Sequence, residues 1–316
     1  MRKIIVIGAS GQIGSELVPF LRNKYGNDNV IATYRKTPLP DTITKAGPVV
    51  YLDALDKNIL SNVFNEYEID TVYHMASILS AKGEKMPQTA WNININGLIN
   101  VLENSRKYDI KNVIWPSSIA VFGPTTPRYN TPNTTILQPT TIYGITKVAG
   151  ELLAEYYYKK FELDIRSIRL PGIISSETLP GGGTTDYAVE IFYEAIKRKE
   201  YTCFLKKETV LPMIYMPDCL KCMTDLLEVD NSKLKRRVYN VTGMSFSAGE
   251  IASEIKNYIP EFQIDYKPDF RQDIADSWPM AIDDSVAREE WDWDPQYDLP
   301  SMTKDMINIL SKRFKK

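Results

Sequence analysis

The chain has 316 residues, of which 43% are hydrophobic, and a formal net charge of −2. This length suits one large α/β unit with a smaller second lobe, and the near-zero charge gives no basic field to attract nucleic acid. No apolar run reaches the roughly 18 residues of a membrane-spanning helix, so we expect no membrane partner.

The first half of the sequence alternates short β-branched runs with helical patterns. Strands are predicted at residues 3–7, 29–33, 49–52, 71–75, 112–117 and 165–170, and helices at residues 14–24, 56–66, 86–107 and 141–160. This alternation predicts a doubly wound parallel sheet, the Rossmann arrangement. In such a sheet the ligands bind at the carboxyl ends of the strands.

The alternation stops after Pro171. Residues 181–183 are three glycines that predict a mobile turn, residues 186–198 predict a helix, and Pro217 suits the first turn of another. Residues 265–293 look irregular and are rich in aromatic side chains. We therefore expect a dinucleotide-binding domain at residues 1–171 and a smaller C-terminal substrate lobe at residues 172–316. One or two segments of this lobe could return to the main sheet.

Three glycines follow the first predicted strand with the spacing GxxGxxG. Gly8 permits a tight turn, Gly11 lets the backbone approach a pyrophosphate, and Gly14 lets the helix pack closely on the strand. The N-terminus of that helix directs N–H groups and a positive dipole end at the phosphates. Glycines also occur in ordinary turns, but the place of residues 8–14 between a strand and a helix favours a cradle for the phosphates of a dinucleotide.

The second strand leaves the identity of the dinucleotide open. It ends in Tyr34, Arg35 and Lys36 instead of the acid that usually holds a ribose hydroxyl. Either cation could pair with the 2′-phosphate of NADP, or both could be solvated loop charges. Asp53, after the third strand, is placed to cap the adenine end or to serve as a turn residue.

Tyr143 and Lys147 are four residues apart in a predicted helix and therefore share one face. A lysine ammonium lowers the pKa of a neighbouring phenol, so that the tyrosine can exchange a proton with a substrate hydroxyl near neutral pH. Ser118 follows the fifth strand and could hydrogen-bond the reacting oxygen or cap a turn. The order of cradle, serine and Tyr-Lys pair predicts redox catalysis with a nicotinamide cofactor.

A metal site and a disulfide framework are not expected. His74 is the single histidine, and the pair Cys219 and Cys222 has no second ligand pair in sequence reach, so core packing is the favoured interpretation. With Cys203, the three thiols suit a reducing, cytoplasmic environment.

With these motifs the sequence resembles the extended short-chain dehydrogenases/reductases, and within them the threonine 3-dehydrogenases related to UDP-galactose 4-epimerase. The resemblance covers nearly the whole chain. Beyond the cradle and Tyr143-x-x-x-Lys147, it rests on residues 79–85, 94–97, 171–175, 183–193 and 278–279. The chain departs from these relatives at Tyr34, where they usually have Asp, which leaves NAD and NADP both open.

The resemblance implies oxidation of the 3-hydroxyl of L-threonine to 2-amino-3-ketobutyrate. Tyr143 would take the hydroxyl proton, Ser118 would orient the hydroxyl, and Lys147 would hold the nicotinamide ribose. Ser118 and Tyr143 would thus contact the substrate at its hydroxyl, and Ser80, Thr184 and Thr185 would hold its polar end, with Trp278 closing over it or packing in the core. The cofactor would contact Gly8, Gly11, Gln12, Ile13, Gly14, Tyr34, Arg35, Asp53, Ala54, Ala76, Asn94, Tyr143, Lys147 and Leu170.

The resemblance also implies a homodimer formed through the helices at residues 86–107 and 141–160. Ser80 could instead be a turn residue, and Thr184 and Thr185 helix caps. The alternative functions are a sugar-nucleotide epimerase or dehydratase on the same scaffold, a silent nucleotide sensor, and oxidation of another 3-hydroxy amino acid. The small, anionic segment at residues 184–186 disfavours a sugar diphosphate, and a sensor would typically have lost Tyr143 or Lys147.

Overall fold

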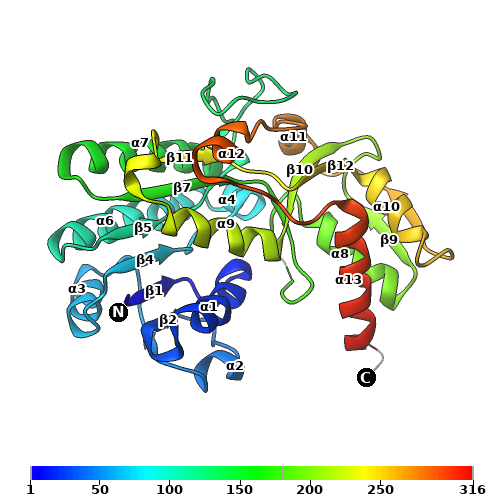
Figure 1. Ribbon diagram of the computed structural model, residues 1–316. Coiled ribbons are helices and arrows are strands. Elements are labelled where there is room, and N and C mark those ends of the chain that lie inside the picture. Colours follow the sequence, from blue (N-terminus) through cyan, green and yellow to red (C-terminus); the bar gives the residue numbers. More distant parts are fainter. Residues whose placement is uncertain (1, 180, 315–316) are drawn as a thin grey trace.

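The computed structural model describes residues 2–179 and 181–314 (Figure 1). Within these residues the largest sheet has eight strands in the order β11-β7-β5-β4-β1-β2-β3, with β6 also paired to β7. Every pairing in it is parallel. The strands are β1 (Ile4–Ile7), β2 (Val30–Tyr34), β3 (Val49–Tyr51), β4 (Thr71–His74), β5 (Asn112–Ile114), β6 (Ser117–Ser118), β7 (Ile165–Leu170) and β11 (Val238–Asn240). The strand order reverses between β1 and β4, which is where ligands bind in such sheets.

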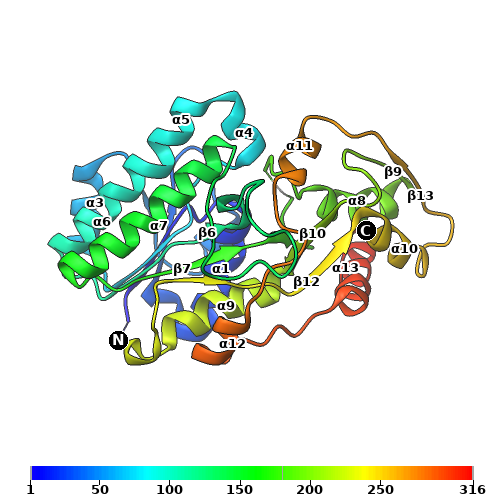
Figure 2. The same cartoon turned by 90° about the horizontal axis from the view of Figure 1, so that it is seen from above.

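Helices cover both faces of this sheet (Figure 2). One face carries α3 (Lys57–Glu66), α6 (Gly97–Lys107) and α7 (Ile142–Phe161), and the other carries α1 (Gln12–Tyr25), α9 (Met216–Glu228) and α12 (Ser285–Trp291). Successive strand residues point to opposite faces. Ile4 and Val6 therefore pack with the α1 side, and Ile5 and Ile7 pack with the α6 side. The predicted doubly wound fold is confirmed.

Two predicted elements differ in detail. The helix predicted at residues 86–107 consists of α5 (Pro87–Trp91), a π-helical turn η2 (Asn92–Asn96), and α6. The strand predicted at residues 112–117 ends at Ile114, two residues before Pro116, which has no N–H for a ladder. The chain then resumes pairing as β6, beside β7.

The C-terminal lobe is built on two small sheets. β10 (Val210–Tyr215) pairs with β8 (Gly172–Ile174) and β12 (Met244–Ser247), while β9 (Glu200–Cys203) pairs with β13 (Gln263–Tyr266). The remaining helices are α2 (Asp41–Thr44), α4 (Ser80–Lys85), α8 (Tyr187–Lys197), α10 (Ala248–Lys256), α11 (Arg271–Asp276) and α13 (Leu299–Phe314), with short 3₁₀ turns η1 (Asn27–Asn29), η3 (Ile119–Val121) and η4 (Asn231–Lys233). No helix among the described residues is long and apolar enough to span a membrane.

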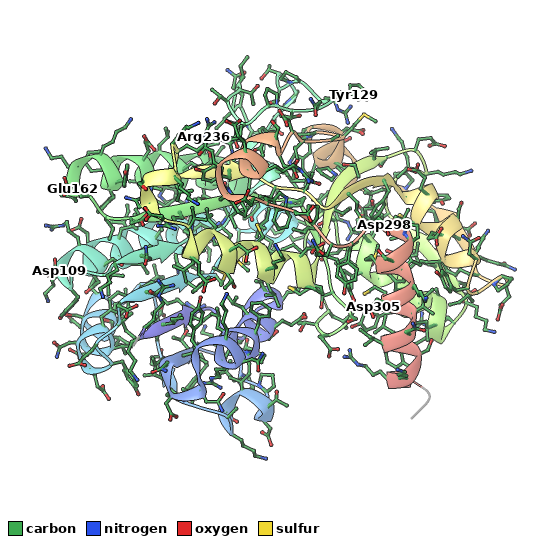
Figure 3. The ribbon with its side chains drawn as sticks, viewed as in Figure 1. Asp109, Tyr129, Glu162, Arg236, Asp298 and Asp305 are labelled. Atoms are coloured by element: carbon green, nitrogen blue, oxygen red, sulfur yellow. The ribbon has the colours of Figure 1, made fainter. Side chains whose placement is uncertain are left out.

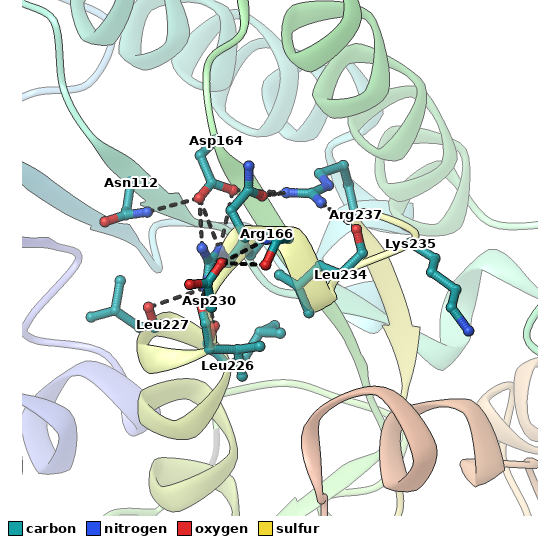
Figure 4. Close-up of polar contacts among 12 residues, drawn as sticks. Asn112, Asp164, Arg166, Leu226, Leu227, Asp230, Leu234, Lys235 and Arg237 are labelled. Atoms are coloured by element: carbon teal, nitrogen blue, oxygen red, sulfur yellow. Dashed lines mark hydrogen bonds and ion pairs between the residues drawn. The ribbon is translucent and has the colours of Figure 1, made fainter.

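A cluster of ion pairs and hydrogen bonds joins β7 to the end of α9 and to the residue before the edge strand β11 (Figure 4). Arg166 in β7 donates to the backbone oxygens of Leu226 (2.6 Å) and Val229 (2.7 Å), which satisfies carbonyls at the end of α9. Asp164 accepts from both Arg166 (2.7 Å) and Arg237 (2.9 Å). β11 lies beyond residue 171 in the sequence and pairs in parallel with β7, so a segment of the C-terminal half belongs to the main sheet. The domain boundary at residue 171 stays a prediction.

Candidate active site

A cavity of about 400 Å³ opens at the carboxyl ends of β1, β4, β6 and β7. It brings together predicted residues of all three groups. These are Gly8, Gly11, Gln12, Ile13 and Gly14 of the cradle, Ser118, Tyr143, Lys147 and Leu170, and the substrate candidates Ser80, Thr184, Thr185 and Trp278. Lys82, Thr178, Leu179 and Asp186 also line it, although the sequence interpretation gave them no role.

The turn between β1 and α1 has the geometry of a phosphate cradle. Gly8 has φ +92°, and a Cβ on Gly14 would lie 2.2 Å from the Gly8 carbonyl oxygen, so both positions require glycine. Ser15 N–H donates to Gly11 O (2.9 Å), which leaves the preceding amides at the start of α1 free of helical partners. The side-chain nitrogen of Gln12 is buried without a hydrogen-bond partner in the described chain. These donors fit the pyrophosphate of a dinucleotide.

The catalytic candidates lie where β6 meets the first turns of α7. Lys147 Nζ is 5.5 Å from the centre of the Tyr143 ring and donates to the carbonyl oxygen of Pro116 (2.6 Å). Ser118 Oγ accepts from Ala120 N–H (3.2 Å), so this serine caps η3 and lines the cavity at the same time.

The charges of this group differ from the sequence-based expectation. Burial raises the pKa of Tyr143 to about 12, although the Ser118 hydroxyl opposes the change. Burial also lowers the pKa of Lys147 to about 7, against the carboxylate of Glu151. Glu151 is itself paired with Arg169 (2.8 Å), so it only partly supports the lysine charge. Burial therefore sets the direction of the tyrosine pKa in this structure, and the lowering expected from Lys147 stays a prediction.

The substrate candidates come from α4, the loop before α8 and the segment after α11. The hydroxyls of Ser80 and Thr184 are 3.2 Å apart and join the first two of these segments. Trp278 is 4% exposed and packs in the core of the lobe while also lining the cavity, and its closing over the substrate stays a prediction. Just after it, Met280 N–H donates to Arg128 O (2.8 Å) in the long loop that carries Tyr129 (Figure 3).

Three of the predicted cofactor residues lie at the ends of β2 and β3, outside the cavity wall. Tyr34 is 38% exposed and meets the ring of Tyr51 edge-on. Arg35 forms a 3.4 Å ion pair with Asp53, and both side chains are partly exposed. These residues lie at the same C-terminal edge of the sheet as the cavity, and their predicted contacts with the far end of the dinucleotide remain predictions.

The other three are structural neighbours of the cavity. The amide of Asn94 accepts from Ile78 N–H (2.8 Å) and donates to Thr146 Oγ1 (3.1 Å), so it ties the loop after β4 to α7. The backbone of Ala76 lies against Gly8, and the carbonyl oxygen of Ala54 accepts from a side chain of α6. Their predicted cofactor contacts remain predictions.

The cysteine pair belongs to the hydrophobic core. Cys219 and Cys222 lie fully buried on the sheet side of α9, and burial raises the pKa of both thiols. Among the described residues, no group of three or more metal-ligating side chains is gathered at one point.

The chain is similar to known proteins over nearly its whole length. Residues 4–242 match the NAD dependent epimerase/dehydratase family. A Staphylococcus epidermidis protein described as an uncharacterized epimerase/dehydratase is 49% identical, covering 100% of this chain and 99% of its own. Among solved structures, L-threonine dehydrogenase from Clostridium difficile is 50% identical with a TM-score of 0.96, covering 99% of this chain and 98% of its own. The enzyme of the same name from Phytophthora infestans is 51% identical with a TM-score of 0.94, covering 98% of this chain and 99% of its own.

Proposed function

The chain belongs to the NAD-dependent epimerase/dehydratase family, and from this premise we propose that it is an L-threonine 3-dehydrogenase. The observation that carries the proposal is the single cavity in which a dinucleotide cradle meets Ser118, Tyr143 and Lys147. Full-length similarity to threonine dehydrogenases at about half identity supports the choice of substrate. The amino acid would be oxidised at C3 to 2-amino-3-ketobutyrate.

Three residues of the cavity, Ser118, Tyr143 and Lys147, have a task in this reaction. A bound nicotinamide dinucleotide supplies the hydride acceptor. Ser118 donates a hydrogen bond to the C3 oxygen and fixes its direction. Tyr143, as the phenolate, takes the proton of that hydroxyl while C3 becomes a ketone. Lys147 would hold the dinucleotide ribose, and its ammonium form would favour the tyrosine phenolate against the opposing effect of burial.

We propose NAD as the cofactor. The ion pair between Arg35 and Asp53 supports this choice, because the carboxylate partly neutralises the cation that could bind a 2′-phosphate. The same carboxylate would repel that phosphate. The exposed Lys36 is the remaining charge at this end of the site.

We propose a homodimer formed through α5, α6 and α7. Ile145, Leu152 and Tyr156 are 44%, 67% and 52% exposed, and their spacing places them on one face of α7. Trp91 at the end of α5 is 41% exposed. Large apolar side chains gathered on neighbouring helices are typical of a subunit interface. The three buried free cysteines suit a cytoplasmic role in threonine breakdown.

Steady-state oxidation of L-threonine, followed as NADH formation, tests the activity. Tyr143→Phe should lower kcat by about 10²–10⁴-fold while the unfolding temperature and the affinity for NAD are retained. Tyr129→Phe is the matched control, because this tyrosine is 73% exposed on an outer loop. Unchanged turnover in Tyr143→Phe contradicts the catalytic assignment. Conversion of UDP-glucose with no oxidation of L-threonine would favour an epimerase.

A further inference from the structure

Asp186, immediately before α8, is a carboxylate in the wall of the cavity that has no task in the reaction described above. Its position before a helix suggests an N-terminal cap, but its side chain makes no capping hydrogen bond. Instead, Oδ2 accepts from Gly182 N–H (2.9 Å) and Gly183 N–H (2.7 Å) and folds the glycine loop back on itself. The aspartate therefore shapes the loop that carries Thr184.

The second oxygen of the Asp186 carboxylate, Oδ1, has no hydrogen-bond partner among the described residues. No lysine or arginine of residues 2–179 or 181–314 lies within ion-pair distance of Asp186. The residue is only 8% exposed. Buried charges in folded proteins are normally paired, because desolvation without a partner is expensive. Residues 2–179 and 181–314 thus hold a buried anion whose counter-charge they do not supply.

Burial without a counter-charge disfavours the ionised form of the Asp186 carboxyl. It raises the pKa of Asp186 to about 6, the Glu190 carboxylate adds to the increase, and the two loop amides and the more distant Arg271 oppose it. The group is still mainly ionised at neutral pH, and a cation placed in the cavity would stabilise that form.

The opposite charge is available on the neighbouring segment. Lys82 of α4 lines the same cavity and forms no ion pair within the described chain. Its Cβ would be 3.8 Å from a Cβ on Gly182, and the Ser80–Thr184 hydrogen bond joins the two segments. Apart from Lys147 beside the catalytic tyrosine, the cavity wall therefore carries the buried Asp186 and the exposed Lys82, neither of them in an ion pair among the described residues. An anion and a cation on neighbouring segments form the charge pattern of a site for a zwitterion.

We propose that Asp186 is the specificity-determining residue that binds the α-ammonium group of the substrate, with Lys82 favouring its α-carboxylate. This inference rests on the proposed function, because a 3-hydroxy amino acid carries both charges next to the carbon that reacts. It explains how the same cavity would bind a 3-hydroxy amino acid more tightly than a hydroxy acid that has the hydroxyl and the carboxylate but no ammonium.

The test compares two ligands that differ in that ammonium group. L-threonine is the substrate, and 3-hydroxybutyrate serves as a competitive inhibitor of its oxidation. Asp186→Asn keeps an oxygen that can accept from the two glycine amides but removes the charge. We expect KM for L-threonine to rise about ten- to a hundredfold, with the inhibition constant of 3-hydroxybutyrate unchanged or lower. Asp186→Ala, which also removes the loop anchor, should weaken both ligands.

Glu190→Gln is the matched control, since this carboxylate lies one turn further along α8, bonded to Tyr201 and outside the cavity wall. It should leave both constants unchanged. Equal loss of both ligands in Asp186→Asn, or an unchanged KM for L-threonine, overturns the proposal while the proposed function stands. A wild-type protein that fails to oxidise L-threonine overturns the proposed function itself.

Discussion

The two ends of the proposed dinucleotide site differ in the chemical groups that form them. The cradle between β1 and α1 consists of backbone amides, and its shape depends on Gly8 and Gly14, where a Cβ would clash with main-chain atoms. The far end consists of side chains, Tyr34, Arg35 and Asp53, all of them partly exposed. The shape of the first end requires positions without a Cβ atom, whereas the second end depends on charged side chains that are partly solvated.

This difference separates two properties of the site. The backbone end determines whether a dinucleotide binds, because pyrophosphate is common to NAD and NADP and binds to N–H groups. The side-chain end determines which dinucleotide binds, because the two cofactors differ only at the ribose. The first property tolerates few substitutions, whereas the second can change through one or two exposed residues without disturbing the fold.

Replacing glycines in the cradle should give the largest effect. In Gly14→Ala the new methyl would lie 2.2 Å from Gly8 O and 2.8 Å from Ala9 Cα, so the helix must move off the strand. We expect a loss of about 3 kcal/mol or more in the free energy of unfolding, measured by denaturant titration.

Gly11→Ala is the matched substitution, because its methyl would meet only Gly8 O, at 3.4 Å. Stability should stay nearly unchanged while the affinity for NAD, measured by fluorescence titration, falls sharply, since the methyl occupies the path of the pyrophosphate. If both variants lost the same stability, the cradle would not be divided into a packing glycine and a binding glycine.

A smaller effect is expected at the ribose end. Asp53→Asn removes the charge that neutralises Arg35 and leaves the guanidinium free for a 2′-phosphate. The ratio of kcat/KM for NADP to that for NAD should rise about tenfold, since a charge-assisted hydrogen bond contributes roughly 1.5–3 kcal/mol. The double variant Asp53→Asn, Arg35→Ala should lose this gain. A ratio that does not move in either variant would show that these charges are solvated and do not select the cofactor.

The sequence predicted the parts of the site that depend on local pattern. The glycine spacing and the Tyr143–Lys147 spacing are each set by neighbours within one element, and the structure brings them to one cavity. The family resemblance added Ser80 and Thr184, which no local pattern would have joined. Their hydrogen bond links residues 104 positions apart.

Features that depend on distant contacts were missed. The π-helical turn at Asn92–Asn96 lies between two α-helices, so the sequence looks like one helix. The bonds of Asn94 to Ile78 and Thr146 depend on residues far away in the sequence and could not be predicted from it. The pKa of Tyr143 followed burial and not its neighbouring lysine. Asp186 reads as a helix cap until the loop amides are placed around it.

The smallest effect should come from a side chain on the cradle helix itself. Glu16 on α1 accepts a hydrogen bond from Ser175 (2.5 Å), whose oxygen also accepts from Thr178 N–H (3.2 Å), so this carboxyl joins the cradle helix to the loop after β8. Burial raises the pKa of Glu16 from 4.5 to about 7, and the Glu177 carboxylate adds to this, while Ser175, Thr178 and Arg313 oppose it.

Because the folded pKa lies above the unfolded value, the folded state favours the protonated acid. That stability is present at low pH and is lost as the pH rises from about 4.5 through about 7. Glu16→Gln stays neutral, so its unfolding temperature should exceed that of the wild type at pH 8, by about 2 °C for each kcal/mol regained, and approach it at pH 5. Asp41→Asn, which removes an exposed carboxylate paired with Lys45, should change the unfolding temperature by the same small amount at both pH values. An equal difference for Glu16→Gln at both pH values would mean that the carboxyl is not held in its neutral form, and that α1 meets the loop only through packing and the bond between Ser15 and Thr178.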